Sequence, residues 1–80
     1  RARVFTSLKT ADMQGALKAL KEKYNSARME EEYIRVYDVD NTEEIVEYLI
    51  QKGFVVNEIK KNKIGLEEYY IEIMSKKEND

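Results

Sequence analysis

Along this chain, segments with apolar residues at every second position alternate with segments in which they recur every three or four positions. This alternation limits the folds that the chain can adopt. Apolar or β-branched residues follow the two-residue period of strands, or cluster as in buried strands, in residues 3–8, 33–37 and 54–60. They follow the helix period in residues 12–24, 41–53 and 65–74. Since 80 residues allow only one modest core, we expect residues 1–80 to form a single α+β domain.

The first predicted helix runs from about Asp12 to Tyr24. Thr10 or Asp12 supplies the side-chain oxygen that the first free backbone N–H groups require. Gly15 is expected to weaken this helix by up to about 1 kcal/mol relative to alanine. Its apolar face is formed by Met13, Ala16, Leu17, Leu20 and Tyr24.

The second predicted helix has the clearest start and stop signals. Asn41 precedes a capping-box arrangement, and Gly53 stands where a left-handed C-cap belongs. Tyr48 is expected to cover the edge of the buried stripe with its ring and to keep its hydroxyl in water. The buried stripe itself is predicted to contain Ile45, Val46, Leu49 and Ile50.

A short additional strand is predicted at Ala27–Glu30, pairing with Tyr33–Tyr37 through the acidic corner Glu30–Glu32. A single strand over Arg28–Tyr37 fits the composition equally well. With the hairpin, the predicted order is β-α-β-β-α-β, the split βαβ arrangement of ferredoxin-like folds. This arrangement has an antiparallel four-stranded sheet with two helices on one face, and here an additional C-terminal helix follows.

The predicted C-terminal helix presents an apolar stripe that needs a receiving surface. Burying five such side chains is worth about 1.5 to 3 kcal/mol each before entropy is subtracted, so we expect them to be covered. The stripe can lie on the open face or edge of the sheet, or contact another subunit or domain. We predict a packing or interaction face formed by Leu66, Tyr69, Tyr70, Ile73 and Met74.

The composition argues against chemistry in these residues. The chain has no cysteine and no histidine, which removes thiolate chemistry, the common transition-metal ligands and the usual general base near neutral pH. Glu30–Glu32, with Asp38 and Asp40 nearby, lacks the spacing of a calcium loop and is interpreted as a solvated turn. Glu67 and Glu68 are interpreted as charges that favour a helix start. We therefore predict a domain that is not an enzyme and has no catalytic, cofactor-binding or metal-binding residue.

The charge pattern argues against nucleic acid and membrane as direct partners. The formal net charge is −2, so the domain lacks the positive field that phosphate backbones require. Tyr33 and Tyr37, alternating with Arg35, could stack bases, but we favour a sheet surface covered by the last helix. The basic stretch Lys60–Lys63 is interpreted as a solvated loop. The longest purely apolar runs, such as residues 69–71, contain three residues and are far too short to insert into a membrane, so we expect a soluble domain.

Two segments resemble the extreme C-terminus of ATP-binding subunits of bacterial ABC transporters. They are Gly65–Met74 and, about ten residues earlier, Gly53–Ile59. The resemblance covers about residues 41–74 and is to exporters of the ABC-2 type, including those linked to drug and bacitracin resistance. Met74 departs from the threonine that the family often has, and residues 1–32 match no motif of it. The phosphate loop, the signature loop and the switch histidine of the ATPase are not present in this sequence.

The resemblance implies a C-terminal accessory or regulatory domain that follows a nucleotide-binding domain. ATP and Mg²⁺ would be bound upstream of Arg1 by the parent transport ATPase. The implied partners are the nucleotide-binding domain of the same chain, a second copy in a homodimer and, indirectly, a membrane permease subunit. The implied location is cytoplasmic, at the inner face of the cell membrane. The alternatives are a free-standing ferredoxin-like regulatory module that binds a small ligand and, least favoured, a small hydrolase. The loop Leu8–Asp12 argues against the ligand-binding module, because it lacks the glycines that let the backbone approach a ligand.

Overall fold

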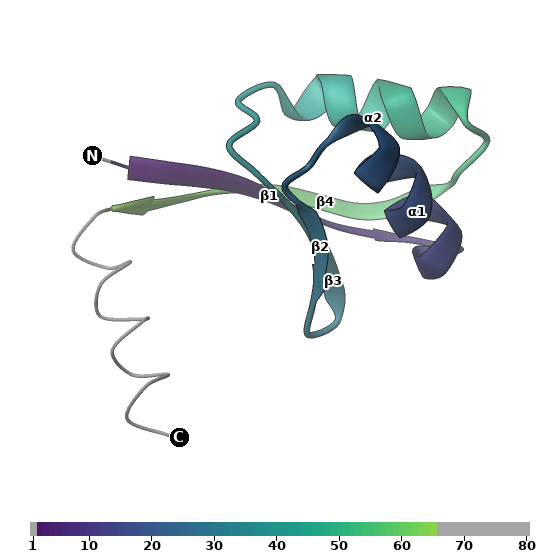
Figure 1. Ribbon diagram of the computed structural model, residues 1–80, viewed down its shortest axis with the longest axis horizontal. Coiled ribbons are helices and arrows are strands. Elements are labelled where there is room, and N and C mark those ends of the chain that lie inside the picture. Colours follow the sequence, from purple (N-terminus) through teal and green to yellow (C-terminus); the bar gives the residue numbers. More distant parts are fainter. Residues whose placement is uncertain (1, 66–80) are drawn as a thin grey trace.

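The computed structural model describes residues 2–65 (Figure 1). It contains two helices and four strands in the order β-α-β-β-α-β. The elements are β1 (Ala2–Thr10), α1 (Met13–Lys23), β2 (Ala27–Glu30), β3 (Tyr33–Tyr37), α2 (Thr42–Gln51) and β4 (Val56–Gly65). The predicted C-terminal helix and its interaction face lie outside these residues, namely Leu66, Tyr69, Tyr70, Ile73 and Met74.

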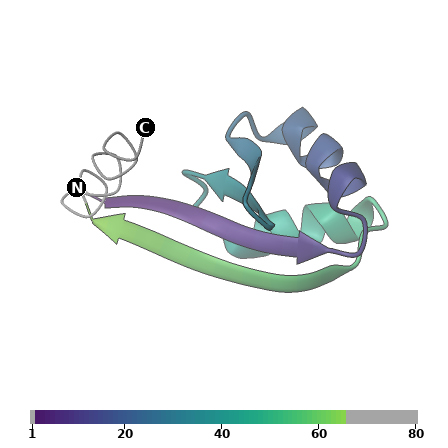
Figure 2. The same cartoon turned by 90° about the horizontal axis from the view of Figure 1, so that it is seen from below.

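The four strands form one antiparallel sheet in the order β2-β3-β1-β4. Both helices lie on the same side of this sheet, and no other helix or strand of residues 2–65 covers its other face, which we call the open face (Figure 2). The prediction of an α+β domain with four antiparallel strands and two helices on one face is confirmed. The hairpin of β2 and β3 is also confirmed, and the alternative of one strand over Arg28–Tyr37 is wrong.

The core lies between the sheet and the two helices. Leu8 of β1 pairs with Ile34 of β3 and with Ile59 of β4, so these side chains lie on the helix-covered face. Directly opposed residues share a face, and the alternate residues point to the other side. The cluster of buried residues consists of Leu8, Ala16, Leu20, Tyr24, Ala27, Ile34, Val36, Ile45 and Leu49.

Both helices begin where their predicted caps lie. The Asp12 carboxylate accepts a hydrogen bond of 2.9 Å from the Gly15 N–H, so Asp12 is the N-cap of α1. The Asn41 side chain accepts from the Glu44 N–H at the start of α2. Gly53 has φ of 89°, the left-handed conformation predicted for it after α2.

Gly15 has a packing role that its helix propensity does not reveal. A Cβ atom at this position would collide with the Asp12 carboxylate oxygen and lie 3.0 Å from the Phe54 ring. Alanine at this position would displace the side chain that caps the helix, which opposes the gain that helix propensity alone predicts for this replacement.

The interface between α1 and α2 contains two tyrosine hydroxyls, each with a hydrogen-bond partner. The Tyr24 hydroxyl donates to Glu44 Oε2 at 2.6 Å, and the Tyr48 hydroxyl donates to the Ala19 carbonyl at 2.8 Å. The prediction that the Tyr48 hydroxyl lies in water is wrong, because a backbone carbonyl of α1 lies within its reach. Burial, followed by the hydrogen bond to Glu44, raises the pKa of Tyr24 well above its usual value.

The buried stripe of α2 is narrower than predicted. Ile45 and Leu49 are fully buried, whereas Val46 is only half-buried and Ile50 is 60% exposed. Residues 45 and 49 lie one turn apart on the same line, and each following residue is rotated by about 100° around the helix. Since α2 packs on the core through one line, Ile50 falls outside the contact and its predicted burial is wrong.

Strand β4 begins two residues later than predicted and ends five residues later. The segment Lys60–Lys63, interpreted from the sequence as a solvated loop, belongs to this strand. Its partner β1 is itself longer than predicted and supplies backbone pairing for β4 from Thr10 back to Ala2. Lysines are common on edge strands because their charge discourages pairing with another sheet.

Candidate functional site

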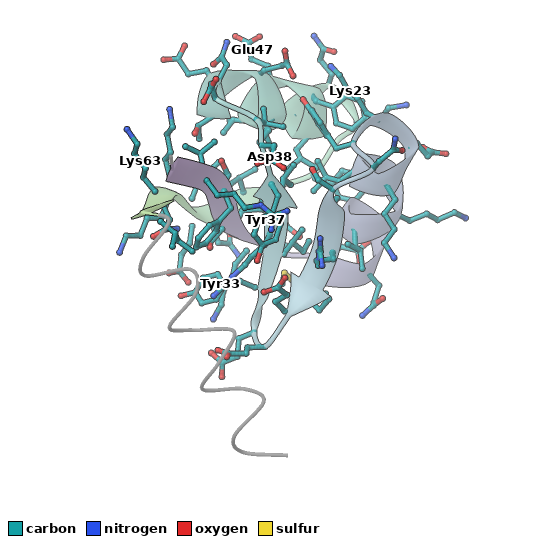
Figure 3. All side chains as sticks on the ribbon, turned by 60° about the vertical axis from the view of Figure 1, so that its left-hand side comes forward. Lys23, Tyr33, Tyr37, Asp38, Glu47 and Lys63 are labelled. Carbon is teal, nitrogen blue, oxygen red and sulfur yellow. The ribbon has the colours of Figure 1, made fainter. Side chains whose placement is uncertain are left out.

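The open face of the sheet carries a mixed layer of aromatic, basic and acidic side chains. Phe5 lies opposite both Tyr37 and Asn62, and Ser7 lies opposite Arg35 and Lys60. Figure 3 shows Tyr33 and Tyr37 along β3, away from Lys23 and Glu47, which belong to the two helices. By register and alternation this open face contains Arg3, Phe5, Ser7, Lys9, Arg28, Glu30, Tyr33, Arg35, Tyr37, Glu58, Lys60, Asn62 and Ile64.

Guanidinium groups cover the aromatic rings at the centre of the open face. The ring centroids of Phe5 and Tyr37 lie 5.3 Å apart, and their side chains are almost fully buried. Arg3 and Arg28 lie over the Tyr37 ring at 4.4 and 4.9 Å from its centroid, and Arg35 lies 4.7 Å from the Phe5 centroid. A nucleic-acid base would have to displace these groups before it could stack on either ring.

Glu30 holds the basic and aromatic side chains of β2 and β3 together. Its carboxylate accepts from the Tyr37 hydroxyl at 2.8 Å and from Arg35 Nη1 at 3.1 Å, and it forms an ion pair with Arg28 at 3.6 Å. Burial raises the pKa of Tyr37, with the Arg35 hydrogen bond opposing this shift. The hydrogen bond to Tyr37 raises the pKa of Arg35.

The three glutamates of the acidic corner therefore lie in different environments. Glu30 is a half-buried acceptor in β2, so its interpretation as part of a solvated turn is wrong, whereas Glu31 and Glu32 form the exposed turn of the hairpin. Glu31 has φ of 56°, a conformation that favours glycine. Within residues 2–65, no group of three or more potential metal-ligating side chains lies close enough together to hold a metal ion.

A second, more exposed cluster ties β1 to the ends of the neighbouring strands. Lys9 Nζ lies 4.7 Å from the centroid of the Tyr33 ring and forms ion pairs with Glu32 and Glu58 at 3.5 and 3.9 Å. The Tyr33 hydroxyl donates to Glu58 at 3.4 Å. Exposed pairs of this kind contribute little to stability.

A shallow depression of about 280 Å³ lies between these two clusters. The Nε atom of Arg35 is buried and has no hydrogen-bond partner among residues 2–65. A buried N–H without an acceptor is energetically costly. The depression is lined by Phe5, Ser7, Glu31, Tyr33, Arg35, Glu58, Ile59, Lys60 and Asn62.

A second surface is apolar and lies where α2 is followed by β4. Across residues 2–65, the large hydrophobic side chains that are exposed are Ile50, Val55 and Ile59, and all three come from this region. Val55 is 62% exposed. A depression of about 330 Å³ adjoins Ile59 and is otherwise lined by Thr42, Glu43, Val46 and Glu47 of α2.

The structure brings together some residues singled out from the sequence and adds others. Tyr33, Arg35 and Tyr37 lie on one face as predicted from their alternation. The sequence reasoning did not identify Phe5 or Arg28 as parts of the same cluster. The available signal was the alternation of residues 3–9, which becomes informative only once β1 is placed beside β3.

Neither helix in the described part of the chain has the length and apolar character needed to cross a membrane. The chain was also compared with protein-family models, with curated proteins and with solved structures, and none of the three comparisons gives a match.

Proposed function

We propose that this chain is a non-catalytic accessory domain of a bacterial ABC transporter ATP-binding protein, of the ABC-2 export type. The observation that carries the proposal is the resemblance of Gly53–Ile59 and Gly65–Met74 to the C-terminus of such subunits. The strand order β2-β3-β1-β4 with its β-α-β-β-α-β connectivity supports the ferredoxin-like part of the proposal.

The exposed apolar residues between α2 and β4 support a role in protein contact. Val55 and Ile59 belong to the first segment of the resemblance, yet Val55 is largely exposed and Ile59 is not part of the buried cluster. Among residues 2–65 they therefore leave apolar area that a protein partner could cover. We propose the nucleotide-binding domain of the same chain, or the twin subunit, as the partner for this surface.

In this arrangement the domain acts through contact rather than chemistry. ATP and Mg²⁺ belong to the nucleotide-binding domain, and the permease subunit holds the assembly at the inner face of the membrane. A domain that packs differently on the open and closed forms of the ATPase changes the equilibrium between them, and thereby the rate of the ATP-driven export cycle.

A small ligand at the strand-to-helix loop has less support from the geometry. The backbone N–H of Ala11 donates to the Val55 carbonyl at 3.1 Å, and the Asp12 carboxylate is already used as a helix cap. The loop therefore offers few free donors to a ligand.

The proposal is tested first by the reading frame upstream of residue 1. A frame that continues back through a phosphate loop and an ABC signature supports the assignment, and a frame without them overturns it.

The contact surface is tested in the full-length protein by the double variant Ile50→Glu with Val55→Glu. We expect a changed ATPase rate or weakened subunit dimerisation with an unchanged Tm, since both side chains are exposed. Lys18→Glu, on the exposed side of α1, is the matched control and should leave both properties intact. If the double variant behaves like the control, the α2–β4 surface is not the contact site.

A further inference from the structure

We propose that β4 is a dimerisation edge, along which two copies of this chain join their sheets into one continuous antiparallel sheet. The inference narrows the contact role proposed for the α2–β4 surface to one partner, a second copy, and it does not rest on the transporter assignment. It is carried by the length of the free edge of β4 and by the order of charges along this strand.

The edge of β4 that faces away from β1 has no partner strand within residues 2–65. Such an edge presents unpaired backbone N–H and C=O groups, which are a template for pairing with another strand. It is also long, because β4 has ten residues, whereas β2 at the opposite edge of the sheet has four. Residues 57–61 are all exposed, so nothing in the described part of the chain shields this stretch.

The charges of β4 exclude most ways of pairing it with its own copy. Directly opposed residues of an antiparallel pair share a face, so a symmetric pair of β4 strands is centred on one residue that lies opposite itself. Like charges directly opposite each other destabilise such a pair. Between residues 58 and 62, most centres bring like charges together, namely those at Glu58, at Lys60, at Lys61 and, because Lys61 then opposes Lys63, at Asn62.

A centre at Ile59 brings opposite charges together instead. It places Glu58 opposite the partner's Lys60, and the symmetry of the pair makes this contact twice. Glu58 already forms an ion pair with Lys9 of β1 at 3.9 Å, so in the joined sheet it would lie between two cations on the open face. The lysines of this edge strand therefore discourage other registers and favour this one.

The helix-covered face of the same centre is apolar, with opposite charges beside it. Ile59 is 37% exposed and would lie opposite the partner's Ile59, so each would cover the other. The adjoining depression of about 330 Å³ is lined by Val46, Glu43 and Glu47 of α2. Lys61 lies on the same face as Ile59, two residues along β4, and supplies a positive charge beside these glutamates.

Sedimentation equilibrium of the full 80-residue chain tests dimerisation. We expect the mass to rise from 9.5 kDa towards twice this value as the concentration increases into the millimolar range. A chain that keeps the single mass throughout, as it would if another segment covered the edge, overturns the proposal.

Charge exchange tests the register. Glu58→Lys and Lys60→Glu each turn two attractive contacts into repulsive ones, so each should raise the dimer dissociation constant by about tenfold. A mixture of the two variant chains again opposes unlike charges and should form the dimer. Glu22→Lys, on the exposed side of α1, is the control with the same charge change and should leave dimerisation intact. Single variants that dimerise like the control, or a mixture that stays monomeric, would overturn the register.

Disulfide cross-linking locates the centre of the pair. The natural sequence has no cysteine, so Ile59→Cys should give a disulfide-linked dimer on oxidation, whereas Asn57→Cys, opposite the partner's Lys61, should cross-link far more slowly. Equal rates would overturn the centre at Ile59. A monomeric chain with an ATPase encoded upstream would overturn this inference alone, and a dimeric chain without one would overturn only the transporter assignment.

Discussion

Replacing Glu30 by alanine should destabilise this domain far more than replacing the neighbouring Glu32. The Glu30 carboxylate accepts from the Tyr37 hydroxyl at 2.8 Å and from Arg35 at 3.1 Å, and the side chains of Glu30 and Arg35 are each only 23% exposed. Hydrogen bonds to charged groups are worth about 1.5 to 3 kcal/mol each. Allowing for partial solvent screening, we expect a loss of about 2 to 3 kcal/mol in the free energy of unfolding.

Glu32 provides the control because it is in the same hairpin and is 81% exposed, with an ion pair to Lys9 at 3.5 Å. Its replacement by alanine should cost less than about 0.5 kcal/mol. In thermal unfolding monitored by circular dichroism, Glu30→Ala should lower the Tm by roughly 10 to 20 °C, since 1 kcal/mol corresponds to about 4 to 8 °C in a domain of this size. Similar shifts for the two variants would refute the assignment of Glu30 as the centre of the open face.

Three further changes test the helices. Gly15→Ala should lower the Tm because the new Cβ collides with the Asp12 carboxylate. In an Asp12→Ala background the same change should instead be neutral or stabilising. A higher Tm from Gly15→Ala alone would contradict the clash. Tyr24→Phe should reduce the loss of stability above about pH 10. The unfolded chain releases the phenolic proton near that pH, whereas the folded chain, in which the pKa of Tyr24 is raised, retains it. If urea unfolding at neutral and alkaline pH shows the same loss of stability with and without the hydroxyl, the effect is excluded. Ile45→Ala should cost about 2 to 5 kcal/mol and Ile50→Ala less than about 0.5 kcal/mol, and equal costs in urea unfolding would show that the exposure of Ile50 is not as described.

The helix boundaries could be predicted because their signals are local. Asp12 and Asn41 cap helices through hydrogen bonds to the backbone three residues away, and Gly53 takes the left-handed conformation that ends a helix. Such signals depend on short-range geometry that the order of residues fixes directly. The burial of Ile50 and the environment of the Tyr48 hydroxyl were predicted wrongly, because both depend on how α2 sits against α1 and the sheet.

The candidate site was only partly accessible from the sequence. The alternation of Tyr33, Arg35 and Tyr37 was visible, but the cluster also needs Phe5 from β1 and Glu30 from β2. The length of β4 was missed for the same reason. Its lysines have weak strand propensity, and their strand conformation depends on β1, which lies some fifty residues earlier in the sequence.

The sequence by itself determined the type and order of the elements between residues 2 and 65, because the period of apolar residues and the caps act within a few residues of the chain. Only the tertiary structure decided which side chains share the open face, that guanidinium groups cover its rings, and that a buried Arg35 donor is left over within this part of the chain. These features arise from strand register, which joins residues far apart in the sequence through backbone hydrogen bonds.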